Sequence, residues 1–328
     1  MLDFLVTQQA LGRPLWMWGA FAALVAILLV LDLGVLHRNH RRIGVRESLL
    51  MSGGYLALGL GFGGFVWWEL GRQAGLEYLT GFLVEKSLAL DNVFIISTIF
   101  AAFAVPAAYQ HRVLFWGVLG VILLRGLMIG FGAALVARFD WLLLVFAAFL
   151  VVMGARMLVS HGPPEDPHQN PVYRWLAARL RLTPGFHGAR FFVRAPDKNG
   201  RRLVLYATPL FLALVMVELA DLVFAVDSIP AIFAITTDPY LVYTSNIFAI
   251  LGLRALYFAL AAVTARFAYL QKALALLLVF IGGKVLVAHM LGWEKFPAPI
   301  SLAVTAALLG GGIVYSMWRT RPVKPLPA

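Results

Sequence analysis

The sequence predicts an all-α polytopic membrane protein of about nine transmembrane helices, with an inverted three-helix repeat. Three observations predict this class. The 328 residues are 61% hydrophobic and only 13% charged, whereas soluble domains contain about 25% charged residues. Nine segments are apolar and long enough to cross about 30 Å of hydrocarbon. Two consecutive groups of three such segments also carry ionisable residues in matching order.

The predicted spans follow one another along the chain and form a single membrane domain, residues 1–328. They lie at about 16–36, 51–70, 78–105, 112–137, 141–160, 206–236, 241–264, 270–291 and 298–318. Of the 27 Lys and Arg residues, 18 fall in connections on one side, four on the other and five within spans. Because cytoplasmic connections carry the positive excess, we expect the N-terminus outside and the C-terminus inside.

The loop 161–205 is the one sizeable connection, and this assignment makes it cytoplasmic. Its YRWLAARLRL segment could form a short amphipathic helix on the anionic inner leaflet, or the loop could be an ordinary positive-inside connection. Protein partners could bind here. The net charge of +11 is concentrated in such connections, so we expect no nucleic-acid partner. After the loop, Thr208 and Pro209 are typical of an N-cap and a first helical turn.

An internal repeat organises the spans. Repeat one covers about 78–160 and repeat two about 206–291. Because each copy has three spans, the second must be inverted in the membrane, and its functional site is expected near the midplane. The polar anchors pair as follows: Glu85 with Asp221, Asp91 with Asp227, Arg125 with Arg254, and Arg156 with Lys284.

Acidic residues inside these spans indicate a cation pathway, because an ionised carboxylate costs at least ~2.5 kcal/mol at the centre of a membrane helix. Residues six apart, such as Glu85 and Asp91, lie ~120° apart around a helix and ~9 Å along it. They cannot share an ion on a straight helix. Asp91 and Asp227 could share one across the pseudo-two-fold axis. The neutral oxygens of Asn92 and Ser228 lie beside them.

Three further acids, Glu85, Asp221 and Glu218, would extend the path or carry protons, since burial favours the neutral form of a carboxyl group. Pro230 would free a backbone carbonyl near Asp227. The available ligands are oxygens, and the chain has no Cys. Such ligands suit Mn²⁺, Mg²⁺ or Ca²⁺ and argue against Zn²⁺ or Cu⁺. We expect neither a cofactor nor an enzymatic reaction.

Five cations within spans could balance the acids. As an alternative, the charges could simply be paired and hold the bundle in register. We expect a mixed role, in which the cations neutralise the acids when the site is empty and release them when metal enters. The expected counterions are Arg125, Arg254, Lys86, Arg156 and Lys284.

The segments VEKSLALDNVF and VELADLVFAVDSIPAIFAITTDP, followed by SNIFAILGLRALYF, resemble the TerC family, especially its Alx-like branch. The resemblance implies a bacterial inner-membrane protein related to LysE-type transporters, and implies manganese export. The family is named after tellurium resistance operons. The residues that match the family motifs are Glu85, Asp91, Asn92, Glu218, Asp221, Asp227 and Ser228.

We therefore expect export of a divalent cation, Mn²⁺ before others, by exchange for protons. The alternative is a membrane scaffold that docks secretion or tellurite-resistance partners without transporting anything. An oxyanion transporter is a third reading, which midplane carboxylates disfavour. The residues alone do not decide between Mn²⁺, Ca²⁺ and Mg²⁺. They also leave open the direction of transport, the coupling ion, the stoichiometry and the oligomeric state.

Overall fold

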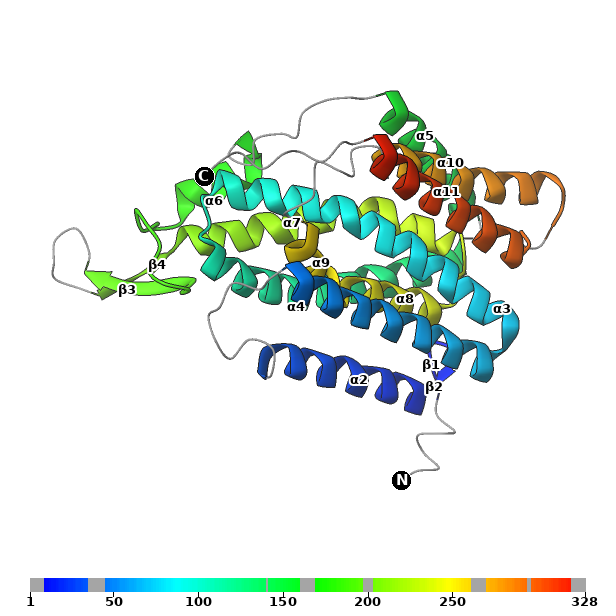
Figure 1. Cartoon of the computed structure of the whole chain (residues 1–328), viewed down its shortest axis with the longest axis horizontal. Helices are drawn as coiled ribbons and strands as arrows, with labels where there is room; N and C mark the ends of the chain where they lie inside the picture. The colour runs from blue at the N-terminus through cyan, green and yellow to red at the C-terminus, as the bar shows by residue number, and fades with distance from the viewer. Residues whose placement is uncertain are drawn as a thin grey trace.

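The computed structural model is a bundle of long helices that run roughly alongside one another (Figure 1). It describes residues 9–34, 45–139, 141–159, 169–196, 203–260, 270–293 and 296–319. Within these residues seven helical segments are long and apolar enough to cross a membrane, and α2 adds a shorter apolar stretch at Leu15–Leu31. The predicted all-α polytopic class is confirmed.

Each predicted span has a helical counterpart. The helices that correspond to the predicted spans are α2 (Leu15–Gly34), α3 (Val45–Ala102), α4 (Ala107–Arg138), α5 (Leu142–Val159), α7 (Pro209–Phe233), α8 (Pro239–Leu251), α9 (Leu253–Leu260), α10 (Leu270–Met290) and α11 (Ala298–Arg319). The predicted second and third spans both fall in α3, and the seventh corresponds to α8 and α9. Gly252 interrupts the helix between α8 and α9, but Pro239–Phe258 still forms one candidate membrane span, so the predicted seventh span is confirmed as far as the described residues extend.

The two spans within α3 form a helical hairpin that turns at Gly71. This residue has φ 87° and ψ 171°, a region that residues with a Cβ atom avoid. The two arms then pack together, and the Tyr78 hydroxyl donates a hydrogen bond to the Gly59 carbonyl at 3.2 Å. A single glycine thus lets one continuous segment cross the bundle twice.

Helix α7 begins as its sequence predicts and continues through Pro230 to Phe233. Thr208 is its N-cap residue and Pro209 its first helical residue. The Thr208 hydroxyl makes no capping bond and instead donates to the Arg190 carbonyl at 2.8 Å. Pro230 lies inside the helix, where its missing N–H leaves the Val226 carbonyl without its usual helical donor. The helix ends one turn later.

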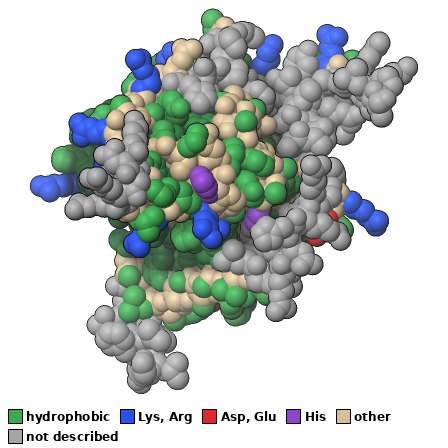
Figure 2. Space-filling model, turned by 90° about the vertical axis from the view of Figure 1, so that its left-hand side faces the viewer, with side chains coloured by type: hydrophobic (Ala, Val, Ile, Leu, Met, Phe, Trp, Pro, Cys, Tyr) green, Lys and Arg blue, Asp and Glu red, His purple; other side chains and the backbone are tan. Residues whose placement is uncertain are grey.

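The loop between α5 and α7 contains the short helix α6 (Pro171–Arg179), which is one of the two possibilities that the sequence left open. It also contains an unpredicted antiparallel pair, β3 (Phe192–Pro196) and β4 (Leu203–Ala207). A second small pair, β1 (Gln9–Ala10) and β2 (Arg13–Pro14), lies at the other end of the bundle (Figure 1). Figure 2 looks onto the β3–β4 end, where blue Lys and Arg side chains clearly outnumber red acids. This is the end that the charge distribution predicts to face the cytoplasm.

Helices α5 and α10 occupy matching positions in the two predicted repeats. If a two-fold axis relates the repeats, each contact of α5 on α10 should have a counterpart of α10 on α5. A Cβ atom at Gly154 would come within 3 Å of the Ala275 carbonyl, and one at Gly282 would meet the Ala147 carbonyl in the same way. Such reciprocal contacts are the mark of a two-fold interface. The remaining helices follow the same relation. In the predicted repeat α3 corresponds to α7 and α4 to α8, and α3 packs on α8 as α7 packs on α4.

Candidate functional site

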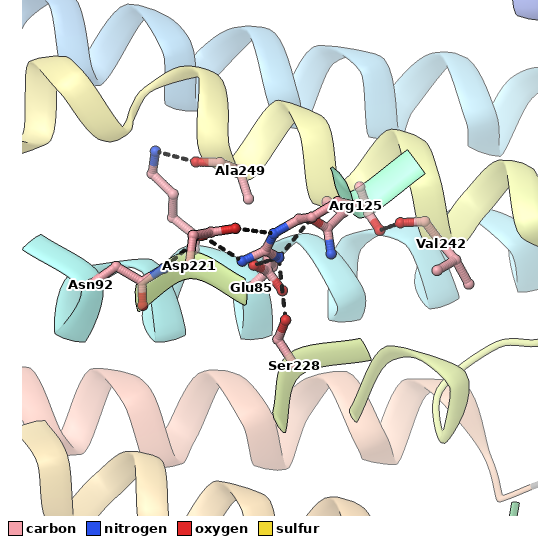
Figure 3. Close-up of polar contacts among 10 residues, drawn as sticks. Glu85, Asn92, Arg125, Asp221, Ser228, Val242 and Ala249 are labelled. Atoms are coloured by element: carbon pink, nitrogen blue, oxygen red, sulfur yellow. Dashed lines mark hydrogen bonds and ion pairs between the residues drawn. The ribbon is translucent and has the colours of Figure 1, made fainter. Parts of the chain in front are cut away.

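Arg125 is the centre of the most deeply buried polar cluster that we identify among the described residues. It lies midway along α4 and is 1% exposed. Its guanidinium makes an ion pair with Glu85 of α3. It also donates two hydrogen bonds to Asp221 of α7, from Nη2 to Oδ1 at 3.2 Å and from Nε to Oδ2 at 3.3 Å. Two acids from matching repeat positions therefore share one arginine (Figure 3).

Neutral side chains complete the cluster. Arg125 Nη1 also donates to Ser228 Oγ at 3.2 Å and to Asn246 Oδ1 at 2.8 Å. Asn92 Nδ2 donates to Asp221 Oδ1 at 3.4 Å. Four helices, α3, α4, α7 and α8, therefore contribute to one buried hydrogen-bond network.

Helical spacing explains why these residues converge. Glu85 and Asn92 are seven residues apart, as are Asp221 and Ser228. Seven residues correspond to nearly two turns, so each pair lies on one face of its helix. These two faces meet at Arg125, which contacts Glu85 of α3 and Asp221 of α7.

The cluster has more acceptors than donors. Two carboxylates face one guanidinium, which leaves a formal charge of −1 if both acids are ionised. Glu85 Oε2 and Asn92 Oδ1 are buried oxygens without a hydrogen-bond partner, and Asn246 Nδ2 is a buried nitrogen without one. A buried polar atom of this kind costs about 1–3 kcal/mol. The two oxygens are chemically suited to accept a proton or a hard cation.

The structure brings together five of the residues singled out from the sequence, namely Glu85, Asn92, Arg125, Asp221 and Ser228. Asp91 falls within α3, Asp227 within α7 and Arg254 within α9, but their side chains lie outside the described part of the chain. Among the described residues, no three His, Cys, Asp or Glu side chains are grouped as a metal site.

Glu218 lies one turn before Asp221 on α7, against α4. Its carboxylate occupies the space that a Cβ atom at Gly120 would need, and its Oε2 is buried without a partner. It is therefore beside the cluster but not bonded to it by any contact that we observe.

Three of the five expected counterions have no contact with the Arg125 cluster that we observe, which corrects the set of counterions drawn from the sequence. Lys86 donates to the Ala249 carbonyl at 3.1 Å, and Lys284 donates to Ser301 Oγ at 2.8 Å. Arg156 is exposed on α5. Lys86 follows Glu85 directly, so it points about 100° away around the helix. Arg125 is the expected counterion that does meet acids of the set, because it forms ion pairs with Glu85 and Asp221.

Asn246 is the cluster member that sequence reasoning missed. It is fully buried in α8 and accepts a short hydrogen bond from Arg125. An amide within the apolar segment SNIFAIL was the available signal, because a polar side chain among membrane helices usually faces a partner.

Comparisons with known proteins agree with these features. A family model described as "Integral membrane protein TerC family" matches residues 70–324. "Uncharacterized membrane protein STKORF319" of Myxococcus xanthus is 45% identical over 315 residues, which cover 96% of each chain. An "Uncharacterized membrane protein" of Rickettsia felis is 45% identical over 92% of this chain and 97% of its own. "Putative membrane-bound redox modulator Alx" of Escherichia coli K12 is 45% identical over 95% and 97%. No solved structure matches.

Proposed function

This chain belongs to the TerC family of integral membrane proteins. We propose that it exports a divalent cation from the cytoplasm, and that Mn²⁺ is its preferred ion. The membrane would be the bacterial inner membrane, and exchange for protons would drive the transport. The observation that carries the proposal is the sharing of buried Arg125 by Glu85 and Asp221, one from each repeat.

The cluster supports a cation rather than an anion as cargo. Its acids outnumber its guanidinium, and two of its orphaned polar atoms are oxygens. In the empty state the guanidinium of Arg125 pairs with both carboxylates and compensates one of their two negative charges. A divalent cation would arrive at Asp91 and Asp227, which are each six residues beyond the acids that Arg125 binds on α3 and α7. Its charge would weaken the ion pairs of Arg125 with those acids. The guanidinium is thus an internal substitute for the transported charge.

Protons provide the counter-flow in this mechanism. A carboxylate that loses its cation in a buried site becomes neutral most readily by taking a proton. Glu218 is the acid best suited to this role, because it is beside Asp221 on α7 and has an unpartnered buried oxygen. Each cycle would then exchange one Mn²⁺ for protons bound at these acids.

Metal binding by the purified protein in lipid nanodiscs tests the proposal. We expect saturable Mn²⁺ binding, measured by loss of the free-ion paramagnetic resonance signal, with weaker competition from Ca²⁺ and Mg²⁺. Asp91→Asn and Asp227→Asn should each weaken binding at least tenfold. Glu69→Gln, which alters an exposed acid of α3, should leave binding unchanged. Absence of saturable binding by folded wild-type protein would contradict the proposal.

A scaffold function is the second candidate, and the β3–β4 hairpin favours it. Phe192, Leu203 and Leu205 are 44%, 71% and 57% exposed on a basic end of the molecule, and Phe192 also packs against Phe211. Apolar side chains that are exposed together on one surface can mark a protein interaction site. Replacing Leu203 and Leu205 with Ser separates the two functions. A scaffold would lose its activity in cells, whereas a transporter would keep its Mn²⁺ flux.

The name of the Escherichia coli relative points to redox modulation. These 328 residues contain no Cys, so a thiol–disulfide route is not open to them. If this protein affects redox balance, metal supply is the route that its buried residues support.

A further inference from the structure

Two adjoining cavities open at the β1–β2 end of the bundle, away from the basic β3–β4 end. The first has a volume of about 400 Å³ and lies among α3, α10, α11 and the segment that follows α7. The second, of about 540 Å³, reaches β2 and the start of α8. Gln73, Glu77, Thr236 and Thr237 line both cavities. We call the two cavities together the outer vestibule.

Buried charges line the vestibule. Glu77 is 5% exposed and accepts a hydrogen bond from Gln73 Nε2 at 2.9 Å. Lys284 is 6% exposed and donates to Ser301 at 2.8 Å. At the rim of the second cavity, Arg13 and Asp238 form an ion pair. A cavity whose wall carries a buried carboxylate and a buried ammonium is not explained by helix packing, which small apolar side chains achieve at lower cost.

The vestibule lies close to the Arg125 cluster but is closed off from it. Glu77 and Glu85 are both on α3, eight residues or about 12 Å apart. Gly81 lies between them, and a Cβ atom there would be 3.2 Å from Ser245 Oγ and 3.9 Å from Ile232. On α7, Phe233 lines the first cavity, five residues after Ser228. None of the residues of the Arg125 cluster lines either cavity, so the two polar regions are separate.

We propose that the outer vestibule is a second cation-binding site, centred on Glu77, which receives the exported divalent cation after it leaves the Arg125 cluster. Lys284, held on Ser301, is the tethered cation that competes for Glu77 when the vestibule is empty. The proposal rests on the proposed function.

The size and chemistry of the vestibule fit a hydrated divalent ion. At roughly 30 Å³ for each water molecule, six waters need roughly 180 Å³, which the first cavity can hold. Hard divalent ions often keep several waters and bind through one or two carboxylates. Hydroxyl and amide oxygens of Thr80, Thr236 and Gln73 could accept hydrogen bonds from such waters. A compact ammonium group is a natural competitor, because it is also a strongly hydrated point charge.

Cysteine labelling tests the vestibule directly, because the native chain has no Cys. Thr80→Cys places a thiol of similar size inside the first cavity, and Thr237→Cys places one where the two cavities meet. Ala178→Cys on α6 is the matched control at the opposite end. We expect an externally added, membrane-impermeant methanethiosulfonate to label the first two in intact cells, and to label Ala178→Cys only after permeabilisation.

Saturating Mn²⁺ should then slow the labelling of Thr80→Cys about tenfold. This protection should disappear in a Glu77→Gln background and persist in an Asp221→Asn background, which alters only the cluster. Labelling of Thr237→Cys but not of Thr80→Cys would overturn the proposal, as would equal rates with and without Mn²⁺. Loss of protection in the Asp221→Asn background would also overturn it. Labelling measures binding in the vestibule and not flux. A failure of the vestibule proposal can therefore be distinguished from a failure of the proposed transport function.

Discussion

Arg125 holds together groups that no other described residue neutralises. It contacts both acids and two neutral oxygens from three other helices. In a low-dielectric interior, removing one partner of such a set leaves the other charges buried and uncompensated. The resulting loss of stability is much larger than the net stabilisation that the ion pairs provide. The same arginine therefore controls both stability and the charge of the candidate cation site.

Arg125→Ala should destabilise the protein by about 3–5 kcal/mol, because Glu85 and Asp221 are left as unpaired buried acids. The expected result is a large fall in the thermal unfolding midpoint in detergent. Arg138→Ala, at the exposed end of α4, is the control and should change the midpoint little. Adding Glu85→Gln and Asp221→Asn should restore much of the stability. A single variant as stable as wild type would show that the cluster is not paired as described.

Gly120→Ala should displace the Glu218 carboxylate, which occupies the position of the new methyl group. If Glu218 carries protons, proton-coupled Mn²⁺ flux should fall several-fold, as it should in Glu218→Gln. Gly130→Ala on the same helix meets no atom within 4 Å and should leave flux unchanged. Normal coupling in both Gly120→Ala and Glu218→Gln would exclude Glu218 from the proton path.

The sequence predicted most members of the cluster but not how they pair. Buried acids in apolar spans stand out by their cost, so Glu85 and Asp221 could be found without a structure. Arg125 was among the expected counterions, but its sharing by both acids could not be predicted, because it depends on how α3, α4 and α7 lie in three dimensions. Asn246 was missed because a single amide in α8 has a much smaller cost and no matching residue drew attention to it.

At the scale of elements, glycines determine where helices turn and how closely they approach. Gly71 makes the α3 hairpin, and Gly154 and Gly282 allow α5 and α10 to approach closely. Membrane helices associate through such small residues, because lipid offers no hydrophobic drive for their contact.

Gly71→Ala should cost about 1–3 kcal/mol, because its backbone conformation is essentially restricted to glycine. The unfolding midpoint should fall. Gly64→Ala, on the same helix with no atom within 4 Å of the new methyl group, should be neutral or slightly stabilising. Equal midpoints for the two variants would mean that the hairpin does not turn at Gly71.

Gly154→Ala and Gly282→Ala should each destabilise the protein by about 1–3 kcal/mol, since each methyl group would press on a backbone carbonyl of the facing helix. The two-fold relation predicts similar losses. Gly283→Ala is the adjacent control, because its methyl group would meet no atom within 4 Å. Guanidinium or thermal unfolding can measure all three. A loss confined to one of the two glycines would contradict the reciprocal interface.

Among the described residues, the length of the apolar segments was sufficient to predict the membrane spans, because the thickness of the hydrocarbon layer sets the length of helix that can cross it. The break at Gly252 was not predictable in this way, since glycine is tolerated in membrane helices. The β3–β4 hairpin escaped for a different reason. Its strands are five residues each and lie in a loop that also contains Pro, Gly and many charges, which conceal a period-two pattern.

At the scale of the molecule, two features give the bundle a direction. Basic side chains collect at the β3–β4 end (Figure 2), and the vestibule opens at the other. The Arg125 cluster lies between them, where α3 and α4 of the first predicted repeat meet α7 and α8 of the second. Such a fold suits alternating access, in which one repeat rocks against the other around a fixed site.

Mn²⁺ flux into proteoliposomes, with lumenal pH recorded, tests the central claim most directly. Wild-type protein should move Mn²⁺ with a linked pH change, and Ca²⁺ or Mg²⁺ should compete weakly. Asp221→Asn should lose at least nine-tenths of the flux while remaining folded, whereas Glu69→Gln should retain it. Folded wild-type protein that moves none of the three ions would contradict transport. Full flux in Asp221→Asn would contradict the role assigned to the Arg125 cluster.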